Sequence, residues 1–147
     1  MTQATASDHD LARRMLSHES AGGGAATHAA AAARVYERLA DRLAPLIGGV
    51  GVRALLARSV NLTKVDFPCF RDLVIQVEGH DHPRAAAPLL AACLGKLEPD
   101  ATFEAAAALF TSLLALLNSL VGERLMRQIL SSSFTVIEQN VAKEKDV

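Results

Sequence analysis

Three potential metal ligands stand next to one another at His80, Asp81 and His82. Imidazole and carboxylate groups bind zinc and related ions, but neighbours in one turn complete a site only when another segment adds ligands. Glu78 lies nearby, and three further histidines lie toward the amino terminus: His9, His18 and His28. No second cluster shows ligand spacing. We therefore interpret 80–82 as a solvated turn in which Asp81 caps the next helix, and we predict no metal and no cofactor.

The segment Gly49-Val-Gly51-Val-Arg-Ala54 matches the loose dinucleotide-binding pattern G-x-G-x-x-A. That chemistry requires a strand before the glycines and a helix after them, so that a pyrophosphate reaches backbone N–H groups at the helix start. The residues before Gly49 have helical periodicity instead, and no series of βαβ units follows. We interpret the glycines as a corner between two helices, where Arg53 could still help to hold an anion.

Side chains for nucleophilic catalysis are present but lack partners. The serines at 131–133 are adjacent, yet no histidine occurs after His82 and no strand–turn–helix elbow surrounds them. Cys69 lies between a proline and a phenylalanine, an apolar setting that raises the pKa of a thiol and lowers its reactivity. We assign no catalytic residue, and the chain is expected not to be an enzyme.

Composition and charge exclude further classes of protein. The chain has 147 residues, the usual size of one domain, and 50% of them are hydrophobic, which argues against disorder. With 15 basic and 16 acidic residues, it lacks the basic excess typical of nucleic-acid binding. Cys69 and Cys93 are predicted to be reduced, buried thiols. The amino terminus lacks the features of a secretory signal, so a cytoplasmic location is expected.

Alanine and leucine dominate, tryptophan is absent and tyrosine occurs once, which favours helices over sheet. We predict an amino-terminal arm at 1–24, with a short helix and a glycine-rich hinge, a single bundle at 25–141, and a charged tail at 142–147. Helices are expected over these ranges: 25–47, 50–60, about 66–79, 83–97 and 100–130, with helical spacing continuing to 141. The run LVIQV within 63–79 could instead form a strand, but a lone strand would have no partner.

The stretch Ala105–Gly122 contains no charged residue and approaches the length of a membrane span. Four polar residues interrupt it (Thr111, Ser112, Asn118 and Ser119), and no aromatic belt flanks it. We therefore predict an all-α, compact bundle of five to six helices around this apolar central helix. Because the helix is apolar on more than one face, a chain of this size is expected to leave part of it uncovered for a partner.

The function predicted from these features is that of a non-enzymatic helical interaction module, a homodimer that serves as a signalling or regulatory adaptor. It is expected to bind protein but neither nucleic acid nor membrane. The alternative is a small-molecule sensor whose apolar pocket lies between helices. That pocket would use an arginine as polar anchor and phenylalanines as lining: Arg53 or Arg71, with Phe67, Phe70, Phe103 and Phe110. An enzyme based on the histidine turn is the third hypothesis.

Overall fold

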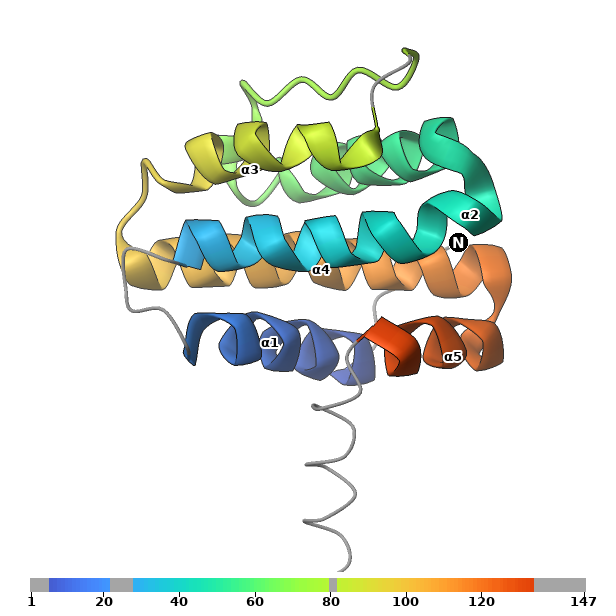
Figure 1. Ribbon diagram of the computed structural model, residues 1–147. Helices are drawn as coiled ribbons and strands as arrows, with labels where there is room; N and C mark the ends of the chain where they lie inside the picture. Colours follow the sequence, from blue (N-terminus) through green and yellow to red (C-terminus); the bar gives the residue numbers. More distant parts are fainter. Residues whose placement is uncertain (1–5, 22–27, 80–81, 134–147) are drawn as a thin grey trace, which may run out of the picture.

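A computed structural model describes residues 6–21, 28–79 and 82–133, and every structural statement below concerns these residues. They form an all-α bundle without a strand (Figure 1), as predicted. Its α-helices are α1 (Ala6–Ala21), α2 (His28–Thr63), α3 (Ala87–Leu94), α4 (Pro99–Val121) and α5 (Glu123–Ser133), and its 3-10 turns are η2 (Pro68–Phe70) and η3 (Pro83–Ala86). The helical spacing predicted for 134–141 and the charged tail lie outside the described residues.

α4 is the central helix, and its neighbours cover it within the chain. It packs against α1, α2, α3 and α5. Most of its side chains from Thr102 to Leu117 are buried, because a stretch without charges can be enclosed on every side. The expectation that this stretch leaves apolar surface uncovered is therefore wrong for the part up to Leu117 and holds only at its end. Exposure of a large apolar side chain is confined to the end of the helix, at Leu120.

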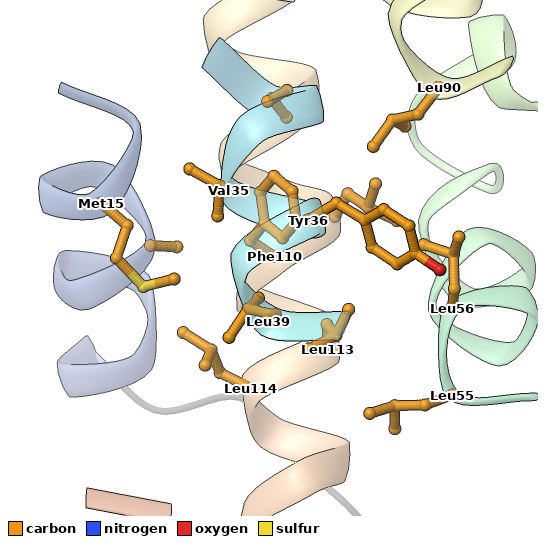
Figure 2. Packing of buried hydrophobic residues seen from close by; sticks show 14 of the residues in the cluster. Met15, Val35, Tyr36, Leu39, Leu55, Leu56, Leu90, Phe110, Leu113 and Leu114 are labelled. Atoms are coloured by element: carbon orange, nitrogen blue, oxygen red, sulfur yellow. The ribbon is translucent and has the colours of Figure 1, made fainter. Parts of the chain in front are cut away.

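The core forms where α1, α2 and α4 meet, and Figure 2 shows it from close by. Met15 comes from α1, Tyr36 and Leu39 come from α2, and Phe110 comes from α4. All four side chains are almost completely buried. Full burial of a large apolar side chain stabilises a fold by about 1.5–3 kcal/mol, so this contact region is a principal source of stability.

The glycine corner predicted within 48–51 is confirmed as a break inside α2. Gly48 has φ 80° and ψ 162°, a conformation that only glycine adopts readily, and helix continues on both sides of it. Before the break, the spacing of Val35, Leu39, Leu43 and Leu46 predicts one buried helical stripe, and the first three of these residues are buried. The prediction is wrong for Leu46, which is exposed, because the helix turns away two residues later.

The predicted helix near 66–79 does not form. Only the single turn η2 is present, and residues 73–77 are neither helix nor strand. Helical spacing would place Val74 inside together with Leu73 and Val77, yet Val74 is 73% exposed. Its β-branched neighbours favour an extended backbone, so the local preference for extended chain prevails over the helical pattern.

Two helices, α2 and α4, are long and apolar enough to cross a membrane when judged by length and composition alone. The most apolar window of α4 is 61% buried inside the bundle, against 39% for that of α2. The core helix of a globular protein passes the same test, so these two helices are weak evidence for a membrane span.

α1, the helix expected at 8–19 in the predicted arm, packs against α2 and α4. Its Glu19 is buried beside two half-exposed arginines of α2. Arg34 Nε donates to Glu19 Oε2 at 3.4 Å, and Arg34 Nη2 donates to the Glu19 carbonyl at 3.2 Å. Arg38 Nε lies 2.9 Å from Glu19 Oε1, an ion-pair contact rather than a hydrogen bond. This buried carboxylate therefore ties α1 to α2.

Glu19→Gln should lower the free energy of unfolding by about 1–2 kcal/mol. This loss is near the low end of the free energies typical of hydrogen bonds to charged groups, because the two arginines are half exposed and water screens their charges. Glu104→Gln is the matched control, since Glu104 pairs with Arg13 at 2.8 Å with both side chains largely exposed, and it should cost less than about 0.5 kcal/mol. Urea denaturation measures both. Equal losses in the two variants would contradict the role assigned to Glu19.

Candidate functional site

A cleft of about 280 Å³ lies between the second half of α2, the non-helical chain from Val74 to Gly79, and the start of the next helical segment. Arg53 lines it from α2, and His82 and Leu89 line it from the opposite wall. Ligand sites in proteins begin at about this size. The cleft is therefore a candidate site for a small ligand.

Arg53 is buried, and its guanidinium holds the non-helical chain in place. Nε donates to the Val77 carbonyl at 2.8 Å, and Nη2 donates to the Gly79 carbonyl at 2.9 Å. An arginine stays charged at all ordinary pH values, so these are charge-assisted bonds to groups that lack secondary-structure partners. The sequence pattern had pointed to Arg53 as a helper in anion binding, but the structure uses it as a clamp on carbonyl oxygens.

The glycines of the dinucleotide-like pattern also have structural roles. A side chain at Gly49 would lie 3.3 Å from Pro83 Cδ, tighter than most such contacts, and 3.7 Å from one Nη atom of Arg53. Gly51 lies inside helix, with no strand before it. The glycines therefore permit η3 to pack closely against α2, and the hypothesis of nucleotide binding gains no support.

Tyr36 is a second clamp on the same region, and sequence reasoning missed it. Its hydroxyl donates to the Pro83 carbonyl at 2.5 Å, and its ring is almost fully buried. Burial raises the pKa of Tyr36 to about 12, although the positive charge of Arg53 acts to lower it. The only available signal was a lone tyrosine beside the apolar stripe of a helix, which is also typical of ordinary core.

A charged cluster lies on the surface beside η3. Arg84 donates to Glu37 at 2.7 Å and lies 3.6 Å from Asp41, and these carboxylates raise the pKa of its guanidinium. His82 Nδ1 accepts the Arg84 backbone N–H at 3.2 Å, and His82 Nε2 lies 3.9 Å from Asp41. His82 thus caps the turn, while His80 and Asp81, the other members of the predicted trio, lie outside the described residues.

Among the described residues, no group of three histidine, cysteine, aspartate or glutamate side chains could hold a metal ion. Two of the histidines near the amino terminus, His9 and His28, take part in helix contacts instead. His9 Nδ1 lies 3.3 Å from Thr111 Oγ1, and His28 packs edge-on against Phe103, with ring centroids 5.5 Å apart. These contacts place both rings between helices rather than in a shared site.

Cys69 and Cys93 lie close together as free thiols, and both line a second cleft of about 310 Å³ with Lys96. Cys93 Sγ donates to the Cys69 carbonyl at 2.8 Å. Burial raises the pKa of Cys69 to about 11 and also raises the pKa of Cys93. The thiols are therefore protonated at neutral pH, when a thiol is a poor nucleophile.

The phenylalanines predicted to line a ligand pocket are dispersed. Phe70 and Phe110 are fully buried in the core, and Phe67 and Phe103 are partly buried against it. None of the four lines the Arg53 cleft, and Arg71 is exposed. Of the predicted pocket residues, Arg53 alone lines that cleft.

The bend of α2 and the turn between α4 and α5 lie at the same end of the bundle (Figure 1), and large apolar side chains near both are exposed. We call this surface the apolar end and define it by four residues, which are 41–64% exposed: Leu46, Val50, Leu120 and Leu125. A shallow cleft beside it is lined by Pro45 and Leu46 from α2 and by residues of α5. Leu120 is thus the one large apolar side chain of the described central helix that is exposed, as expected for a helix with uncovered apolar surface.

Comparison with known protein families, with curated proteins and with solved structures gives no match.

The titration of Tyr36 tests the clamp directly, because the chain has one tyrosine and no tryptophan. We expect its phenolate absorbance to appear near pH 12 in the folded protein and near pH 10 in urea. A pKa raised by folding means that the associated stability is complete below pH 10 and is lost as the pH rises toward 12. Ionisation of the native protein near pH 10 would show that the hydroxyl is not buried on Pro83.

Proposed function

We propose that this chain is a non-enzymatic interaction module that forms a homodimer through the apolar end. One observation carries the proposal: four large apolar side chains from three helices are exposed at one end of the bundle. The other large exposed apolar side chains of the described residues, Leu62, Val65, Val74 and Leu89, belong to other parts of the chain. Scattered apolar side chains are ordinary on a protein surface, but a contiguous group usually marks a binding surface.

The charges around the apolar end favour a second copy of the chain as its partner. Residues of both signs flank it: Asp41 and Arg42 on α2, and Glu123, Arg124 and Arg127 on α5. In a two-fold interface the same patch meets itself, so a rim of mixed sign can pair positive with negative groups. The formal net charge of −1 adds little repulsion between copies.

We place the module in the cytoplasm as a signalling or regulatory adaptor, without a role in membrane or nucleic-acid binding. The burial of α4 by its neighbours and the balance of charges support this placement. A bundle whose described clefts hold no catalytic set, and whose thiols are protonated, fits an adaptor better than an enzyme.

Leu120→Glu and Leu46→Glu should convert the dimer to monomer. Each change places an unpaired carboxylate in a desolvated apolar contact, which should weaken association at least tenfold, by about 1.4 kcal/mol or more. Sedimentation velocity at micromolar concentration measures the change. Val65→Glu is the matched control. Val65 is also highly exposed but follows the end of α2 at Thr63, which lies 15 residues beyond Gly48, about 22 Å along the helix. A monomeric wild-type chain at micromolar concentration would end the dimer proposal.

The second candidate function is that of a small-molecule sensor, and the Arg53 cleft is the observation that favours it. A fatty or aromatic acid bound there should raise the melting temperature by roughly 5–10 °C at 100 times its Kd. Ala85→Phe would fill the cleft from its exposed wall and should abolish the shift, whereas Ala92→Phe, exposed on the same side of the bundle but outside this cleft, should preserve it. A shift that survives Ala85→Phe would place the ligand elsewhere.

A further inference from the structure

The chain from Leu73 to Glu78 has the burial pattern of a strand. Its odd-numbered residues, Leu73, Ile75 and Val77, are partly buried, and the even-numbered residues between them are exposed. A period of two is typical of an extended backbone, in which successive side chains point to opposite sides. The segment thus has strand-like alternation without a neighbouring strand in the described chain.

One edge of this segment is already bonded to the fold. In an extended chain, successive residues direct their backbone N–H and C=O groups to opposite edges. The Leu73 N–H donates to the Phe70 carbonyl at 3.2 Å, and Arg53 holds the carbonyls of Val77 and Gly79. Leu73, Val77 and Gly79 therefore form the bonded edge, although Ile75 between them makes no backbone hydrogen bond within the described residues.

The other edge, formed by Val74, Gln76 and Glu78, is unpaired. Within residues 6–21, 28–79 and 82–133, no hydrogen bond is made by the backbone N–H or C=O groups of these three residues. We call it the open edge. A row of exposed, unpaired backbone groups is a template on which another chain can form strand hydrogen bonds.

A groove runs beside this segment, with α3 as its far wall. The Arg53 cleft is lined by the segment and by Ala85 and Leu89, and the adjoining cleft shares Val74 and Leu89 with it. Leu89 is half exposed although it faces this groove. Figure 1 shows the segment lying along the outer side of α3. A helix wall on one side and a strand edge on the other leave room for a single extended chain rather than for a second bundle.

We propose that this groove binds an extended peptide segment of a partner protein by strand addition to the open edge. The partner's alternate side chains are small or β-branched and apolar, because the wall they meet consists of Ala85 and Leu89. A basic residue lies beside Glu78, whose exposed carboxylate makes no ion pair within the described residues. This surface is separate from the apolar end, so the inference does not rest on the proposed dimer.

The test begins with a random peptide library selected against the purified full chain. Selected peptides should alternate apolar residues and carry one lysine or arginine, and fluorescence polarisation gives their Kd. A backbone N-methyl group at a central residue of the peptide should weaken binding at least tenfold, because it removes one ladder hydrogen bond and places a methyl group between the strands.

Gln76→Pro tests the same bond from the protein side. It removes an N–H that has no partner in the described chain, at an exposed position outside any helix, so the fold should be retained. We expect at least a tenfold loss of peptide affinity, whereas Gln76→Ala, which keeps the N–H, should change affinity less than threefold. Glu78→Lys should select against basic peptides and favour acidic ones.

The native ionisation of Tyr36 serves as the folding control for every variant. Leu89→Lys, on the opposite wall, should also abolish binding, and Leu120→Glu should leave it unchanged. Three results would overturn the inference: no selected peptide, peptides that tolerate N-methylation, or full affinity in Gln76→Pro. Self-association lost in Gln76→Pro but kept in Leu120→Glu would instead identify a second copy of the chain as the occupant of the open edge.

Discussion

Enclosure of the charge-free stretch of α4 is the constraint on which the bundle depends. A helix with apolar residues all round can remain in water only if neighbours cover each of its faces. α2 and α1 supply most of that cover, α3 and α5 supply the rest, and side chains such as Phe110 and Leu113 are left almost without exposure. α1 is therefore an integral part of the core, held to α2 by the buried Glu19.

The helices enclose α4 without requiring the non-helical chain to be helical as well. The backbone polar groups of that segment must therefore find hydrogen-bond partners outside a helix. A backbone carbonyl away from water costs free energy unless it is bonded. Arg53 meets that need at Val77 and Gly79, and Tyr36 meets it at Pro83. Arg53 thus holds the non-helical chain from one side only, and Tyr36 holds the start of η3. The two edges of the segment therefore differ, because one edge is hydrogen-bonded whereas no described side chain bonds to the backbone of Gln76 on the other.

Sequence periodicity predicts the parts of the fold where one pattern applies and fails where two patterns overlap. The spacing of Val35, Leu39 and Leu43 is compatible only with a helix, and the two adjacent glycines that follow are compatible only with a break in that helix. The apolar residues of 70–77 satisfy both helical and extended spacing, and the strand alternative was discounted because no second strand was available. The structure shows why that reasoning failed: a buried arginine takes the place of the missing strand on one edge. A side-chain clamp of this kind depends on tertiary contacts, which a single sequence does not reveal.

The break at Gly48 links the two surfaces through one short piece of α2. Leu46 and Val50 of the apolar end lie within two residues of it, and Arg53 follows five residues after it, about 7.5 Å along the helix. Gly49 meanwhile permits Pro83 to pack closely against this piece. The direction that α2 takes after Gly48 therefore sets both the exposure of Leu46 and Val50 in the apolar end and the position of the guanidinium that orients the open edge. Since only glycine adopts φ 80° with ψ 162° at little cost, this one backbone conformation positions the part of each surface that α2 contributes.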